Sequence, residues 1–183
     1  MKRCILHIAL FVAAAVVLTA CGSGKKSGVW TDGTFSLNYP PETYEVTGED
    51  KDGELSCFTI SCKEEPSNKI EFKVYRYEPD FVKTIRIDQI AGELKADVCE
   101  IRERLCGMLN VTDGSDLIFP EELGLPYEVN AFLKAEAPDG DGLFVRITSS
   151  QIENYNVIAI ALGDSPERML DYAGILSSMR VEF

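Results

Sequence analysis

Six cysteines are the residues of this 183-residue sequence with the widest range of possible chemistry. Four of them lie well inside the chain and could form disulfides, bind zinc or remain free thiols: Cys57, Cys62, Cys99 and Cys106. Spacings of five and seven residues lack the Cys-x-x-Cys knuckles that structural zinc sites use. The sequence therefore favours free, partly buried thiols, keeps one or two disulfides as the alternative, and gives least support to a metal site.

The positions of these cysteines restrict which disulfides could form. Cys57 and Cys62 are five residues apart in one expected strand, so they point to opposite faces and cannot bridge each other. Cys99 and Cys106 are seven residues apart on one expected helix, about 10 Å along its axis. Any disulfide must then join helix to strand. Because Cys62 shares a face with apolar neighbours, we expect Cys62 to be the partner of Cys99 or Cys106 in that case.

Acidic side chains offer two further kinds of chemistry. Segments 49–54 and 139–142 could supply oxygen ligands to calcium, but neither completes a twelve-residue EF-hand loop with a distal glutamate. We therefore expect both segments to be solvated turns. A pair of carboxylates could hydrolyse a glycosidic bond without histidine, although the sequence does not single out one pair among 30 acidic residues.

The start of the chain has the layout of an export signal. Lys2 and Arg3 precede an apolar run over residues 5–18, as in a secretory signal peptide. The run is shorter than the roughly 20 apolar residues that a membrane-spanning helix needs. It is followed by Leu-Thr-Ala-Cys at residues 18–21 and then by a polar segment rich in Gly and Ser. This order predicts a cleaved signal and argues against a spanning helix.

These residues resemble the lipobox of bacterial lipoproteins, in which the cysteine is acylated and becomes the new N-terminus. The resemblance implies a signal peptide over residues 1–20, lipidation of Cys21, and a flexible tether over residues 21–28. Acyl chains on Cys21 would hold the protein at a membrane without a spanning helix. We therefore expect an exported protein of the bacterial cell envelope that is anchored by lipid.

Charge and histidine content exclude several classes of function. The formal net charge is -12, and segment 1–20 contains basic residues and no acid, so its removal leaves a still more negative domain. Such a surface repels nucleic acid, which is not an expected partner. His7 is the only histidine and lies in the signal segment. Ser-His-Asp catalysis, histidine bases and HExxH zinc sites are therefore excluded from the mature protein.

Hydrophobic periodicity predicts one α+β domain over residues 29–183. Alternation of apolar and polar residues predicts strands over 29–31, 35–39, 57–62, 70–75, 127–137, 143–150 and 155–162, and a short strand over 180–183. The last three long strands suggest an antiparallel meander. Asp-Gly pairs at 32–33, 52–53, 113–114, 139–140 and 141–142 are typical of hairpin turns.

Two helices complete the expected domain. Apolar residues recur at spacings of three and four from Ile87 to Met108 and predict an amphipathic helix over about 87–109. Ser165 as N-cap and Pro166 at the first helical position begin a second helix.

The two ends of this domain resemble PsbP-like domains. Residues 33–40 (GTFSLNYP) are similar to their opening strand, and residues 155–158 and 175–181 are similar to their closing strand, helix and strand. The resemblance implies an antiparallel sheet sandwiched by helices. It brings no catalytic residue and no cofactor, and it implies an accessory role, because characterised relatives act by docking on other proteins.

The sequence thus predicts a noncatalytic envelope lipoprotein that docks on a protein partner. The alternative is a histidine-free, carboxylate-based hydrolase acting on envelope or dietary glycans. Four aromatic residues could form a glycan or protein contact surface, although packing is the favoured role: Trp30, Tyr39, Tyr75 and Tyr77.

Overall fold

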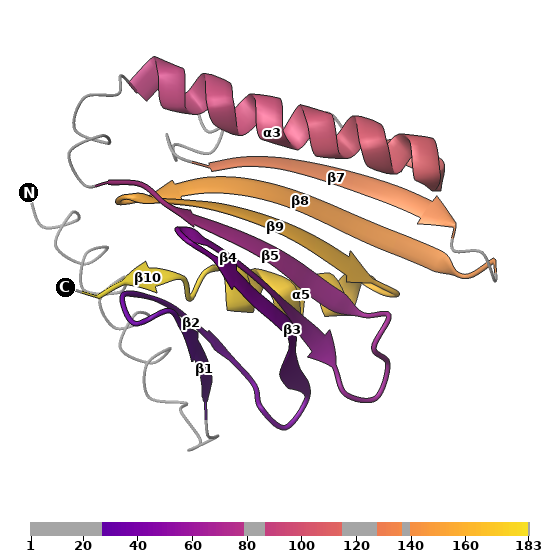
Figure 1. Ribbon diagram of the computed structural model, residues 1–183. Coiled ribbons are helices and arrows are strands. Elements are labelled where there is room, and N and C mark those ends of the chain that lie inside the picture. The colour runs from indigo at the N-terminus through magenta and orange to yellow at the C-terminus, as the bar shows by residue number, and fades with distance from the viewer. Residues whose placement is uncertain (1–26, 79–86, 115–127, 137–139, 183) are drawn as a thin grey trace, which may run out of the picture.

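The computed structural model describes residues 27–78, 87–114, 128–136 and 140–182 (Figure 1). The expected signal peptide 1–20 and the expected lipidation site Cys21 lie outside the described residues, so both remain predictions. Within the described ranges, no helix is long and apolar enough to cross a membrane.

A small sheet is built from both ends of the domain. It contains β1 (Gly28–Thr31), β2 (Phe35–Tyr39) and β10 (Arg180–Val181), with β2 in the centre. The Asp32 side chain caps the turn between β1 and β2 by accepting hydrogen bonds from the backbone N–H groups of Thr34 and Phe35 at 2.9 and 2.8 Å. The expected opening hairpin is therefore confirmed.

A larger sheet of seven antiparallel strands has the order β3-β4-β5-β9-β8-β7-β6. Its strands are β3 (Tyr44–Asp52), β4 (Leu55–Cys62), β5 (Lys69–Arg76), β6 (Asn110–Gly114), β7 (Glu128–Glu136), β8 (Gly142–Ile152) and β9 (Tyr155–Gly163). The expected meander is β7-β8-β9, and β9 also pairs with β5 from Lys69↔Leu162 to Arg76↔Tyr155. That pairing joins the early strands to the late ones.

Two segments that we expected to be turns lie in edge strands instead. Residues 49–52 belong to β3, and Asp113-Gly114 belongs to β6, where these two residues pair with Lys134 and Leu133 of β7. Both strands are largely exposed: only Tyr44 is buried and Val46 half-buried in β3, and only Val111 is half-buried in β6. Edge strands tolerate charged side chains on both faces, so hydrophobic periodicity does not identify them. The Asp52-Gly53 turn is confirmed between β3 and β4.

Helices cover the large sheet from both sides (Figure 1). Helix α3 (Ile87–Met108) packs on β7 and β8, whereas α5 (Pro166–Leu176) packs on β9, β8 and β2. The expected α+β class and antiparallel sheet between helices are confirmed, with the small sheet as an additional layer beside α5. Met108 is 74% exposed, so the expected apolar stripe of the long helix ends before this residue.

Helix α5 begins as its sequence predicts. The Ser165 hydroxyl accepts a hydrogen bond from the backbone N–H of Arg168 at 3.3 Å, and Pro166 occupies the first helical position. Tyr172, Ile175 and Leu176 are buried, while Ala173 is only half-buried. These three buried residues determine which side of α5 faces the sheet.

We call the side of the large sheet that faces α5 and the small sheet the closed face. Its core contains a stack of three aromatic rings: Trp30 lies 3.7 Å from Phe58, and Phe58 lies 4.7 Å from Phe72, between ring centroids. All three side chains are at most 5% exposed. Trp30 therefore packs in the core, which is the role that the sequence favours over a contact surface.

Candidate functional site

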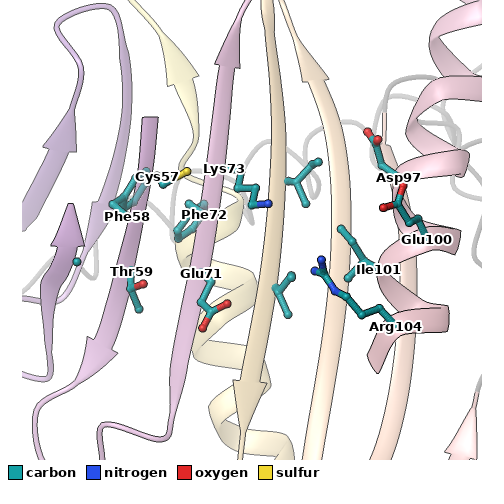
Figure 2. Close-up of a pocket in the computed structure, with 13 residues that line it drawn as sticks. Cys57, Phe58, Thr59, Glu71, Phe72, Lys73, Asp97, Glu100, Ile101 and Arg104 are labelled. Atoms are coloured by element: carbon teal, nitrogen blue, oxygen red, sulfur yellow. The ribbon is translucent and has the colours of Figure 1, made fainter. Parts of the chain in front are cut away.

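The opposite side of the large sheet, which faces α3, is only partly covered, and we call it the groove face. Helix α3 packs on β7 and β8, and a cavity of about 310 Å³ opens between the helix and strands β4, β5 and β9 (Figure 2). Strand alternation turns Phe58 and Phe72 toward the closed face, so their neighbours Thr59 and Glu71 point to the groove face. The same strands therefore build both the core and the groove.

Charged side chains form the two walls of this groove. Glu71 and Lys73 extend from the sheet, while Asp97, Glu100 and Arg104 come from one side of α3 at spacings of three and four residues. Figure 2 shows the Lys73 amine and the Arg104 guanidinium both projecting into the space between β5 and α3. The groove thus presents cations and carboxylates to the same small volume.

Neither Lys73 nor Arg104 forms an ion pair with a carboxylate of the described residues. Glu71 pairs with Lys69 at 2.7 Å, outside the helix wall. Within the part of the chain that the structure describes, no carboxylate lies within the 4.0 Å of an ion pair with Lys73 or Arg104. A cation without a fixed partner can pair with an anionic group of a ligand at little cost in broken contacts.

The floor of the groove is apolar. Ile101 of α3 and Ile158 and Ile160 of β9 lie beneath the charged walls. Ile158 and Ile160 also pack against the core under α3, which fixes their positions. An apolar floor with charged walls suits a ligand that has an apolar body and charged groups at its sides.

Asp97 is a half-buried carboxylate of the groove. Burial raises its pKa, and the neighbouring Glu100 raises it further. Hydrogen bonds from Ser149 and Asn156 partly oppose this effect, and the Ser149 hydroxyl lies 3.2 Å from Asp97 Oδ2. A half-buried acid without a paired cation destabilises the folded state when it is ionised, and such acids are often found in functional sites.

The structure contains all four inner cysteines as free thiols. Cys62 is buried among the closed-face core, Cys57 is half-buried in the groove, Cys99 is half-buried and Cys106 is exposed. The expected opposite orientation of Cys57 and Cys62 is confirmed. The expected disulfide partner is wrong, because α3 lies on the groove face with Cys57 and the sheet separates it from Cys62.

The acidic segments do not form a metal cage in the described residues, where no group of three His, Cys, Asp or Glu side chains converges. Glu49 instead accepts a hydrogen bond from the indole N–H of Trp30 at 3.2 Å. Its neighbours in β3 are exposed, as expected for solvated acids. Asp139, the first residue of the other acidic segment, lies outside the described residues.

Comparison with known proteins gives similarity in structure only. No protein-family model matches the sequence, and no curated protein matches it. The structure is similar to the solution structure of cyanobacterial PsbP (CyanoP) from Synechocystis sp. PCC 6803, with a TM-score of 0.47 and 10% sequence identity. The match covers 88% of this chain and 97% of that chain. At this level, the similarity assigns no residue role or activity to this chain.

Proposed function

We propose that this chain is a noncatalytic, lipid-anchored accessory protein of a bacterial envelope that docks a protein partner along the groove between α3 and β5. The observation that carries the docking role is the position of Lys73 and Arg104 above an apolar floor, where neither is ion-paired within the described ranges. Protein interfaces commonly combine an apolar centre with complementary charges at its rim. The ordered signal that ends at Cys21 supports the anchor.

Anchoring is tested by Cys21→Ser in cells that express the full chain. We expect the variant to leave the membrane fraction or to accumulate as an unprocessed precursor, because acylation needs the thiol. Cys106→Ser, which removes an exposed thiol from the folded domain, serves as the matched control and should fractionate like the wild type. If wild-type and Cys21→Ser proteins fractionate and migrate alike, the proposed anchor is wrong.

Docking is tested by placing a photo-crosslinking amino acid in the full chain in cells. At Lys73 it should yield one discrete crosslinked species, because this side chain points into the groove. At Glu64, an exposed position on the loop between β4 and β5, the same probe should not yield that species. Identical products from both positions, or none from Lys73, would contradict a docking role for the groove.

The hydrolase remains the second candidate because Asp97 provides one carboxylate of raised pKa in a cavity. Incubation of the purified chain with envelope glycans should release reducing ends if this alternative is correct. Loss of that release in Asp97→Asn would assign the activity to the groove and would replace the noncatalytic proposal.

A further inference from the structure

A second pocket continues the groove toward the beginning of α3. Its volume is about 490 Å³, and it shares Asp97 and Ile158 with the cavity described above. Two tyrosines at the end of β5, Tyr75 and Tyr77, form one wall, and Glu93 and Asp97 of α3 form another. We call this site the aromatic pocket.

The two tyrosines of the aromatic pocket pack against each other. Their ring centroids are 4.8 Å apart with an interplanar angle of 68°, an edge-to-face arrangement. Tyr75 remains 42% exposed, in contrast to the fully packed rings of the closed face. The exposed ring of Tyr75 therefore lies beside a cavity, where a ligand can reach it.

The charge of the aromatic pocket is negative. Its acidic members are Glu93 and Asp97, and none of the described residues that line it carries a positive charge. Burial is the main cause that raises the pKa of the Tyr77 phenol, and the charges of these two carboxylates raise it further. Their negative charge therefore acts at the Tyr77 ring. A ligand group that enters this space meets aromatic rings and negative charge together.

This combination selects an organic cation over a metal ion. An ammonium group is attracted to aromatic rings as well as to carboxylates, whereas a hard metal ion needs several converging oxygen ligands. Ala96 and Ile158 line the same pocket and could contact the methylene stem of a long basic side chain. The net charge of -12 adds a general attraction for a basic partner.

We propose that the aromatic pocket binds the ammonium group of a lysine side chain on the protein partner that docks along the groove. This inference rests on the proposed docking function and names the chemistry of the partner. The partner's lysine contacts Tyr75 and Tyr77 and lies between them and the carboxylates of Glu93 and Asp97.

The spacing along β5 adds a requirement for the partner's sequence. Tyr75 and Lys73 are two residues apart on the same face of the strand, which is about 7 Å. In an extended partner segment that lies along β5, the side chains on one face recur at the same distance. A lysine in the aromatic pocket therefore places an acidic residue two positions away next to Lys73, so the recognised pattern is a lysine and an Asp or Glu separated by one residue.

The test measures binding of the capped peptide Ac-Gly-Lys-Gly-Glu-Gly-NH2 to the full chain in a nonionic detergent, by titration calorimetry. A detergent without ammonium groups is required because a choline head group would compete for the pocket. Tyr75→Leu removes the ring and keeps an apolar side chain, and we expect it to weaken binding about threefold to tenfold. Tyr75→Phe keeps the ring and should restore affinity.

Two variants that each remove one negative charge distinguish binding in the aromatic pocket from attraction to the overall negative charge of the protein. Glu93→Gln should weaken binding of the lysine peptide, whereas Glu64→Gln, which removes the same charge from an exposed loop, should not. Replacing the peptide's lysine by glutamine should abolish the difference between wild type and Glu93→Gln.

Two results would overturn the inference. Equal loss in Glu93→Gln and Glu64→Gln would show attraction to net charge alone. Loss in Lys73→Gln without loss in Tyr75→Leu would leave docking in the groove intact and remove the aromatic pocket from it. If the probe at Lys73 gives no crosslink in cells but peptide binding is unchanged, the proposed docking function is wrong and the lysine site is retained.

Discussion

The two faces of the large sheet are built from the same strands and serve different purposes. On β4 and β5, Phe58 and Phe72 point to the closed face, where both are 2% exposed within an aromatic stack. Thr59 and Glu71, one residue away on each strand, point to the groove face, where they line an open cavity. Each strand therefore alternates between side chains that pack in the core and side chains that line the cavity.

The difference between the faces predicts that stability depends on the closed face and the proposed binding on the groove face. Burial of large aromatic rings provides the stronger contribution to stability, since it removes the most apolar surface from water. Polar groove residues contribute little to folding, and one of them, Asp97, opposes it. Substitutions on the two faces should therefore have different effects on unfolding and on binding.

The largest expected effect is on the closed face. Phe58→Ala removes the central ring of the stack and should lower the free energy of unfolding by about 3 to 5 kcal/mol. Its neighbour on the groove face provides the control, and Thr59→Ala should cost less than about 1 kcal/mol. Urea denaturation followed by the fluorescence of Trp30, the only tryptophan, measures both. Equal costs at the two positions would refute the division between the faces.

The next effect compares two cysteines of one strand. Cys62→Ser places a hydroxyl in the closed-face core and should cost about 1 to 3 kcal/mol, whereas Cys57→Ser in the groove should cost little. The same denaturation experiment gives both values. Thiol counting on the unfolded, unreduced chain should show that Cys57, Cys62, Cys99 and Cys106 are all free, and any linkage of Cys62 to α3 would contradict the arrangement described.

Much of the fold could be predicted from the sequence because buried faces leave a periodic signal. Alternation identified the hairpin of β1 and β2, the strands β4 and β5, and the meander, and spacings of three and four identified α3. Edge strands β3 and β6 escaped because only one or two apolar residues of each contact the core, Tyr44 and Val46 in β3 and Val111 in β6, which are too few for a period-two signal. The separation into two sheets also depends on contacts between distant segments.

The candidate site could be predicted only in part. Tyr75 and Tyr77 were recognised as possible contact residues, and the orientation of Cys57 followed from strand alternation. No local sequence pattern indicates that β5 and α3 line the same groove, because tertiary packing brings residues 71–77 and 93–104 together. Asp97 and Arg104 lie on the polar side of a helix, where charged residues ordinarily contact water.

A smaller effect on stability is expected at the start of α5, the helix that covers the closed face. Ser165→Ala removes the side-chain cap of α5 and should lower the free energy of unfolding by about 1 kcal/mol. Ser165→Asp keeps an acceptor at the helix start and should restore most of the loss. Circular dichroism during thermal unfolding measures both variants. An unchanged melting temperature in Ser165→Ala would show that packing alone, without the cap, holds α5 on the sheet.

The smallest expected effect lies in the groove and has the opposite sign. Asp97→Asn removes a charge whose burial raises the pKa of the carboxyl, and the amide can still accept the hydrogen bond from Ser149. We therefore expect a slight gain in stability at neutral pH. Glu103→Gln, which removes the same charge from an exposed position of α3, should give no comparable gain.

The pH dependence of this gain distinguishes burial of the Asp97 charge from other causes. Because the folded-state pKa lies above the ordinary value of 3.8, the folded state binds the proton more tightly than the unfolded state. The wild type therefore loses stability as pH rises from the ordinary value through the folded-state pKa, and the loss is constant above it. The advantage of Asp97→Asn should accordingly vanish in acid and reach its maximum near neutral pH, in urea denaturation repeated between about pH 3 and pH 7. If Asp97→Asn is less stable than the wild type at neutral pH, the ionised carboxylate stabilises the fold, and Asp97 is a structural residue of the groove face rather than a group kept for binding.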